Sequence, residues 1–161
     1  MFYLHLPKTQ KMQEKVYPNA IPTVDIAVLR LNSDHTYSLL LGKKEHEPKW
    51  RFVGGFVDAD DSSYESAAVR ELFEETNLVA TTDEIKYVGS TKIDDPRYRN
   101  HKDKIITHLY LLEIPATTAG IQPKDDIKAL QWFPLASFSK EDMMEVHHPI
   151  VALFMKYFER L

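Results

Sequence analysis

Three glutamates stand at a spacing that suits metal binding. Glu71, Glu74 and Glu75 occupy positions i, i+3 and i+4, so on a helix their carboxylates share one face. Like charges at this spacing destabilise an isolated helix by about 0.2–0.5 kcal/mol per pair, whereas a hard divalent cation with oxygen ligands would neutralise them. A solvated helix face is the commoner explanation of such charges. The residues that precede the helix favour metal binding over a solvated face.

Paired glycines come before this helix. Residues 50–55 read Trp-Arg-Phe-Val-Gly-Gly, which predicts a strand that runs into Gly54 and Gly55. A backbone without Cβ atoms can approach a ligand or a metal closely. Glycines followed by clustered carboxylates indicate chemistry on phosphate groups with a bound metal.

The helix itself has clear start and stop signals. Ser62 and Glu65 form an S-x-x-E capping box, and Asn77 tolerates the left-handed conformation that ends many helices. The face that we expect to be buried carries Ala67, Ala68 and Leu72. The charged residues Arg70, Glu71, Glu74 and Glu75 must then lie on the boundary or on the opposite face.

Composition indicates one soluble intracellular domain. The chain has 161 residues, which lies in the single-domain range, and it has no cysteine, which excludes disulfides and thiolate zinc sites. The formal net charge of −4 offers no basic footprint for nucleic acid. No long apolar run and no secretory signal is present, so we expect no membrane contact and a cytoplasmic location.

The order of elements predicts a mixed sheet with helices packed on it. Strands are expected at residues 23–31, 37–42, 50–57, 85–93, 105–114 and 130–133. Pro134 should end the last strand, and Pro149 should begin a C-terminal helix with an apolar stripe. The β-β-β-α-β-β-β-α order is compatible with an α/β sandwich, although periodicity alone does not select it.

The segment 54–78 resembles the Nudix box, G-x5-E-x7-R-E-U-x-E-E-x-G-U, where U is a bulky apolar residue. Residues 70–78, Arg-Glu-Leu-Phe-Glu-Glu-Thr-Asn-Leu, match its second half. Asp61 stands where the first Glu is expected, the stretch from Gly55 to Arg70 is one residue longer, and Asn77 replaces the last glycine. The resemblance implies a Nudix-type α/β/α sandwich with a mixed central sheet. It also implies one Nudix hydrolase domain over residues 1–161, with 1–20 as an N-terminal extension.

Membership of that family implies a catalytic site. Mg2+ or Mn2+ would be held by Glu71, Glu74, Glu75 and the carbonyl of Gly54 or Gly55, and a bound water would attack one phosphorus of a pyrophosphate. Arg70 would orient a neighbouring glutamate, so Glu71, Glu74 and Arg70 form the expected catalytic set. The general base stays open among Glu71, Asp94, Asp95, Asp125 and Asp126.

Residues outside the box indicate the substrate. Residues 94–110 resemble the D-x-P-x-R…R-x-I-T-H-x-Y run of ADP-ribose pyrophosphatases, especially the domain fused to nicotinamide-nucleotide adenylyltransferases; residues 125–135 and 145–148 are similar to two further pieces of that group. The implied reaction converts ADP-ribose into AMP and ribose 5-phosphate. The side chains expected to bind substrate are Arg51, Arg97, Arg99 and Lys104. His108, Trp132 and Pro134 are better explained as structural residues.

Other activities remain open at this stage. A nucleotide-sanitising pyrophosphohydrolase acting on a nucleoside triphosphate shares the box, and so does a broad hydrolase of diphosphate derivatives. A non-catalytic ADP-ribose sensor is a candidate of another class; such sensors usually have an eroded glutamate set and an attached DNA-binding unit, for which we see no room here. Related pyrophosphatases are often dimers, and the aromatic segment Met1–Leu6 is a candidate for that contact.

Overall fold

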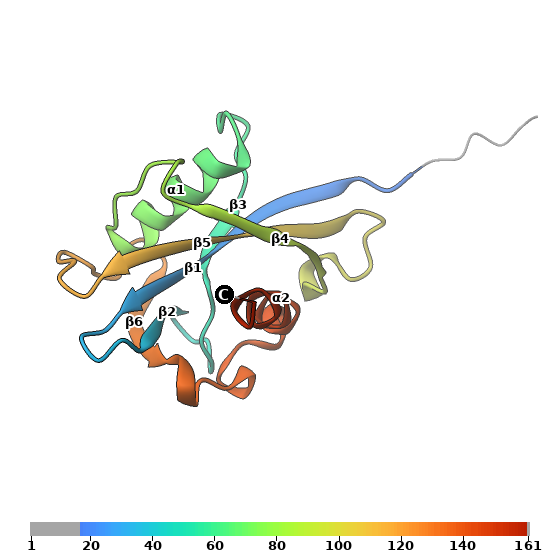
Figure 1. The fold of residues 1–161 in the computed structure, drawn as a ribbon. Helices are drawn as coiled ribbons and strands as arrows, with labels where there is room; N and C mark the ends of the chain where they lie inside the picture. The colour runs from blue at the N-terminus through green and yellow to red at the C-terminus, as the bar shows by residue number, and fades with distance from the viewer. Residues whose placement is uncertain (1–16, 161) are drawn as a thin grey trace, which may run out of the picture.

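Six strands and two α-helices form the body of the described chain (Figure 1). The computed structural model describes residues 17–160. The strands are β1 (Ala20–Leu31), β2 (Tyr37–Lys44), β3 (Val53–Phe56), β4 (Lys86–Ile93), β5 (Lys104–Pro115) and β6 (Ile127–Pro134). The helices are α1 (Tyr64–Thr76) and α2 (His148–Phe158). The dimer contact expected of Met1–Leu6 lies outside the described residues.

The sheet is mixed, as predicted. Its order is β4-β5-β1-β2-β6, with β3 also paired to β1. β1 runs parallel to β5 over its whole length, and the other pairings are antiparallel. β3 pairs with residues 23–26 of β1 and β2 with residues 28–31, so the two strands follow one another along the same edge of β1.

Alternate residues of β1 face the two helices. Val24, Ile26 and Val28 belong to the apolar cluster that includes the buried face of α1. Ala27 and Leu29 belong to the other cluster, which includes α2. The helices thus cover opposite faces of the sheet (Figure 1), which confirms the expected α/β/α sandwich.

The helix α1 starts one residue later than the sequence predicts. Its N-cap is Ser63, whose Oγ accepts from the Ser66 backbone N–H at 3.1 Å, while Ser66 Oγ accepts from the Ser63 N–H at 2.9 Å. The predicted box of Ser62 and Glu65 is wrong, because Glu65 instead accepts a hydrogen bond from Tyr110 Oη of β5 at 2.8 Å. The helix ends at Asn77 in the left-handed conformation, with φ of 61°, as predicted.

The strands β3 and β6 differ most from the expected ranges, and the others differ by three residues or fewer at either end. Of the residues 50–57 only Val53–Phe56 form a strand, because Arg51 bridges to Gly42 and Trp50 bridges to Met143. β6 is longer than expected and begins at Ile127, but it ends at Pro134 as predicted. No helix among residues 17–160 has the length and apolar character needed to cross a membrane.

Candidate active site

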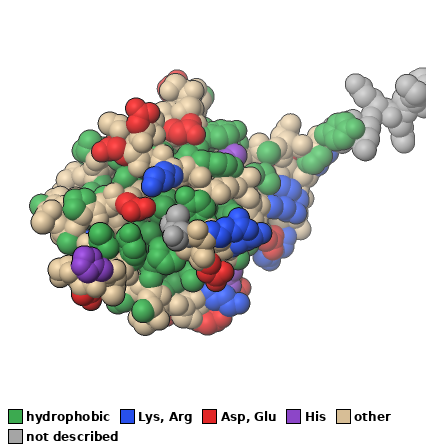
Figure 2. Space-filling model, viewed as in Figure 1, with side chains coloured by type: hydrophobic (Ala, Val, Ile, Leu, Met, Phe, Trp, Pro, Cys, Tyr) green, Lys and Arg blue, Asp and Glu red, His purple; other side chains and the backbone are tan. Residues whose placement is uncertain are grey.

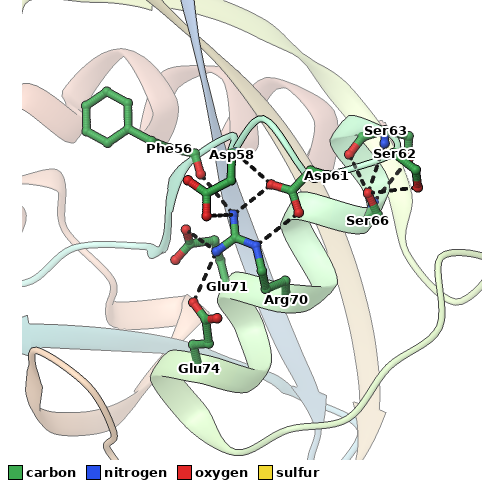
Figure 3. A network of polar contacts seen from close by, with 9 residues as sticks. All are labelled: Phe56, Asp58, Asp61, Ser62, Ser63, Ser66, Arg70, Glu71 and Glu74. Carbon is green, nitrogen blue, oxygen red and sulfur yellow. Dashed lines mark hydrogen bonds and ion pairs between the residues drawn. The ribbon is translucent and has the colours of Figure 1, made fainter.

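Arg70 is the centre of the polar network at the start of α1 (Figure 3). Its Nε and Nη2 donate to the two oxygens of Asp61 at 3.0 and 2.8 Å, and Nη2 also donates to the Phe56 carbonyl at 3.0 Å. Its Nη1 donates to Glu71 Oε1 at 2.9 Å and to Glu74 Oε2 at 3.1 Å. Arg70 thus contacts two of the three glutamates, and its role in orienting one of them for catalysis stays a prediction.

The charges of this network stabilise one another. The hydrogen bonds of Arg70 hold the pKa of the Asp61 carboxyl below its usual range, and Asp61 in turn raises the pKa of Arg70. Burial raises the pKa of Glu71, and the contact with Arg70 opposes that effect. Arg70 therefore partly offsets the cost of placing the half-buried Glu71 carboxylate beside the glycines of β3.

Glu75 is held from the other side by the glycine backbone. Its side chain is buried, and Oε2 accepts from the Gly54 N–H at 2.8 Å. Burial raises the pKa of Glu75 to about 8, and the bond from Gly54 works against this. A cation bound at Glu75 would relieve the cost of burying that charge.

Both glycines are required by close contacts. Gly54 has φ of 147°, and a Cβ there would lie 2.1 Å from the Val24 carbonyl oxygen of β1. A Cβ on Gly55 would lie 2.5 Å from Glu71 Oε1. The glycines thus let β1, β3 and the glutamates of α1 approach one another at one point.

The glutamates do not form a preassembled metal cluster. In the part of the chain that the structure describes, no group of three or more His, Asp or Glu side chains is placed to share one ion. Arg70 binds Glu71 and Glu74, while Glu75 turns to Gly54. The donor set still fits a hard divalent cation in kind, because it consists of carboxylates and glycine backbone, with Glu75 buried and Glu71 half-buried.

A cavity of about 580 Å3 opens beside the two glycines. Two of the four predicted substrate-binding residues, Arg51 and Arg97, line it. Arg97 donates to Asp95 Oδ2 at 2.7 Å, and its guanidinium lies 5.5 Å from the ring centre of Phe56. The volume lies in the range of small-molecule sites.

The other two predicted residues lie elsewhere. Arg99 pairs with Asp94 at 3.0 Å and lines a separate cavity of about 490 Å3. Lys104 donates to the Arg99 carbonyl and lines neither cavity. Arg99 is exposed and Lys104 is half-buried, and Figure 2 shows Lys and Arg side chains gathered on this side of the molecule.

The four aspartates considered as general bases also lie in different places. Asp95 and Asp126 line the larger cavity, where Asp126 is paired with Lys44. Asp94 lines the smaller cavity, and Asp125 lines neither of them. Asp95 is held by Arg97, which lowers the pKa of its carboxyl.

A protein-family profile described as NUDIX domain matches residues 21–154. The chain belongs to the Nudix family. Its match covers the sheet, the glutamate helix and most of α2.

Three Nudix relatives illustrate the range of the family. The ADPR responsive transcriptional repressor NtrR of Acinetobacter baylyi is 28% identical over 145 residues, which are 86% of this chain and 54% of the repressor. A bifunctional NMN adenylyltransferase/ADP ribose pyrophosphatase of Francisella tularensis, solved with AMP and a manganese ion, is 27% identical with a TM-score of 0.63, over 88% of this chain and 42% of that one. The NUDIX domain of Shewanella oneidensis NrtR, solved with ADP ribose, is 20% identical with a TM-score of 0.68, over 92% of this chain and 94% of that one. This chain thus spans about half the length of the repressor and less than half of the bifunctional protein.

Two of the three departures from the Nudix box have structural explanations. Asp61, in place of the expected Glu, accepts hydrogen bonds from Arg70 with both carboxylate oxygens. Asn77, in place of glycine, adopts the left-handed conformation and donates from Nδ2 to the Gly120 carbonyl at 3.0 Å. Both residues therefore have defined contacts in the helix region of this protein.

Sequence reasoning missed a buried polar group on the α2 side of the cavity. Asp25 accepts a hydrogen bond from Thr107 Oγ1, and its other oxygen lies 3.7 Å from Nδ1 of His147. Burial raises the pKa of Asp25 to about 6 and lowers that of His147 to about 3. The available signal was an aspartate inside the apolar run of residues 24–29.

The structural interpretation of His108, Trp132 and Pro134 is supported. His108 stacks on Tyr64 with ring centres 4.2 Å apart, and Trp132 lies under the guanidinium of Arg30 at 4.3 Å. None of the three residues lines the larger cavity. On the same strand, Thr107 is buried and His108 is half-buried.

Proposed function

We propose that this protein is a metal-dependent pyrophosphohydrolase that cleaves ADP-ribose to AMP and ribose 5-phosphate. The observation that carries the proposal is the junction at Gly54 and Gly55. Glu71 and Glu75 lie against these two glycines, which also line the cavity that contains Arg51 and Arg97. A diphosphate in this cavity would lie between acidic metal ligands and basic side chains.

Each part of the site has a task in this reaction. A Mg2+ or Mn2+ ion would lower the pKa of a bound water and neutralise charge on the pyrophosphate. Glu71, Glu74 and Glu75, with a glycine carbonyl, would hold the ion, for which Glu71 and Glu74 must turn away from Arg70. Arg97 presents its guanidinium at the cavity wall, where it can bind a phosphate oxygen in bidentate geometry.

ADP-ribose is favoured by the relatives. The Francisella protein carries ADP ribose pyrophosphatase in its name, and the Acinetobacter repressor is responsive to the same compound. We also propose that residues 21–154 form one domain with a cytoplasmic location, since ADP-ribose is an intracellular nucleotide. The net charge of −4 supports a role without nucleic acid binding by the domain itself.

A second candidate is an ADP-ribose sensor without catalysis. It is favoured by the match to a repressor and by the pairing of Arg70 with Glu71 and Glu74, which leaves no preassembled cluster in residues 17–160. A sensor would bind ADP-ribose through the same cavity and release it unchanged. The intact set of three glutamates favours the enzyme.

A substrate screen tests the proposal. The purified protein with Mg2+ is incubated separately with ADP-ribose, NADH, a dinucleoside polyphosphate and a nucleoside triphosphate, and the products are separated by chromatography. We expect AMP and ribose 5-phosphate from ADP-ribose at the highest kcat/KM. A preference of about tenfold for the triphosphate would contradict ADP-ribose as the substrate. Tight binding of ADP-ribose without any product would support the sensor.

A further inference from the structure

The segment that joins β2 to β3 carries three charged residues of the larger cavity wall. Lys44, Glu47 and Arg51 all line the cavity that opens beside the two glycines. Lys44 is the last residue of β2, and the register of β2 against β6 shifts at that point. A register shift bends a strand away from its regular course, so residues 44–51 follow the cavity wall.

Glu47 contacts both cationic residues through different oxygens. Its Oε2 accepts from the Lys44 N–H at 3.1 Å, and its own N–H donates to the Lys44 carbonyl at 3.2 Å. Its Oε1 forms an ion pair with Arg51 Nη1 at 3.6 Å, and both side chains are 20% exposed. One carboxylate thus fixes the backbone of Lys44 and the guanidinium of Arg51.

Each cation also has a second partner. Arg51 Nη2 donates to His147 Nε2 at 3.2 Å, because a guanidinium has no acceptor atom. Lys44 Nζ forms an ion pair with Asp126, which directly precedes β6. These contacts do not use all the N–H groups of an ammonium or of a guanidinium, so both cations keep donors for a ligand.

The charges of this group cancel. Lys44 and Arg51 are positive, and Glu47 and Asp126 are negative, so the group creates no net field that attracts an anion from a distance. It offers instead donors that are already fixed in place. Such donors bind the oxygens of an anion with little further loss of side-chain freedom. The orientation of the two cations is therefore the property that Glu47 controls.

We propose that Glu47 is a positioning residue, which holds Lys44 and Arg51 so that both donate to the diphosphate of the substrate. Its carboxylate acts through the two cations. Lys44 is thereby a substrate-binding residue in addition to the four that the sequence predicted. The inference rests on the proposed function only in that the bound anion is a diphosphate.

The direction of a mutational effect separates this role from that of an acid that merely lies nearby. Glu47→Ala removes one negative charge from the cavity wall, and loss of charge alone would let an anion bind more tightly. Loss of positioning acts in the opposite direction, because both cations gain freedom that binding must then remove. We expect the affinity for a diphosphate to fall about tenfold.

Calorimetric titration with inorganic pyrophosphate at a fixed Mg2+ concentration measures this effect and does not depend on cleavage of ADP-ribose. Glu47→Gln keeps an acceptor for the Lys44 N–H and should retain part of the affinity. Glu45→Ala is the matched control. It removes the same charge two residues away, and the one ion pair of Glu45 among residues 17–160 is with His46 at 4.0 Å. This variant should bind pyrophosphate at least as tightly as wild type.

Steady-state kinetics distinguish positioning from a general loss of structure. Glu47→Ala should raise KM for ADP-ribose about tenfold and leave kcat within about twofold of wild type, because Glu47 contacts the cations and not the glutamates of α1. If thermal unfolding shows that Glu47→Ala is poorly folded, Glu47→Gln replaces it and should still bind pyrophosphate more weakly than Glu45→Ala. Unchanged or tighter pyrophosphate binding in the Glu47 variants, or no binding by wild type, would overturn the positioning role.

The two proposals can fail separately. If wild type does not cleave ADP-ribose but its affinity for pyrophosphate depends on Glu47, the pyrophosphohydrolase is wrong and the positioning role stands. If ADP-ribose is cleaved and Glu47→Ala changes neither KM nor the affinity for pyrophosphate, the positioning role is wrong and the pyrophosphohydrolase stands.

Discussion

His147 stays neutral in the folded protein because its ring is buried beside the Arg51 guanidinium, which lowers its pKa to about 3. In an unfolded chain a histidine titrates near a pKa of about 6.5. The stability that depends on neutral His147 is therefore complete above pH 6.5 and is lost as the pH falls toward 3. Asp25 acts in the opposite sense, because its pKa is raised to about 6 and its protonated form favours folding.

His147→Gln should remove this acid sensitivity. Between pH 7 and pH 5 wild type should lose about 1–2 kcal/mol more unfolding free energy than the variant, because only wild type must protonate a buried ring on unfolding. Urea denaturation at the two pH values measures the difference. The exposed His101→Gln is the control and should follow wild type. Parallel pH curves for His147→Gln and wild type would contradict the buried neutral state.

The basic side chains near the cavity should differ in their effects on activity. Arg97→Ala should lower kcat/KM for ADP-ribose, mainly by raising KM. The loss of transition-state stabilisation should be about 2 kcal/mol, which is typical of a charged hydrogen bond. Lys104→Ala should have little effect, because Lys104 lies outside the cavity and contacts the Arg99 carbonyl. Steady-state kinetics of both variants provide the measurement. An equal loss in both would mean that the cavity does not define the substrate site.

Local signals predicted the elements of this fold better than their boundaries. The end of α1 at Asn77 and the end of β6 at Pro134 depend on single residues, and both were predicted. The start of α1 was misplaced because Glu65 bonds to Tyr110, which is 45 residues away in sequence. Contacts of that kind leave no local pattern.

The helix α1 provides a direct test of its corrected N-cap. Ser63→Ala should lower the free energy of unfolding by about 1 kcal/mol, because it removes the acceptor for the Ser66 N–H. Ser62→Ala should change it much less, since among residues 17–160 the Ser62 hydroxyl makes one hydrogen bond, to Ser66 Oγ at 3.3 Å. Chemical denaturation of both variants distinguishes the two caps. A larger loss in Ser62→Ala would restore the predicted capping box.

The candidate site was predictable only where its residues are close in sequence. The glutamates and glycines lie within 22 residues of one another, and the glycines together with the glutamate spacing predicted a site there. The cavity combines β1, the segment after β2, the β4–β5 loop and the turn before α2, so its wall depends on the assembled sheet. Arg99 and Lys104 follow Arg97 closely in sequence, but they lie on another surface.

In the whole molecule, two groups of ionisable side chains lie on opposite faces of the sheet. The α1 face of the sheet carries the glutamates, and the α2 face carries Asp25 and His147. The two sides meet at Gly54 and Gly55, where the absence of Cβ atoms allows close approach. We therefore expect the diphosphate of the substrate to bind at this junction.

The most direct test of this account is the hydrolysis of ADP-ribose by Glu75→Gln in the presence of Mg2+. The substitution keeps the shape of the side chain and an acceptor for the Gly54 N–H, but removes the ligand charge. We expect kcat to fall by orders of magnitude while the melting temperature of the metal-free protein does not decrease. Turnover close to wild type in this variant, or wild-type turnover that survives EDTA, would contradict metal-dependent hydrolysis at this site.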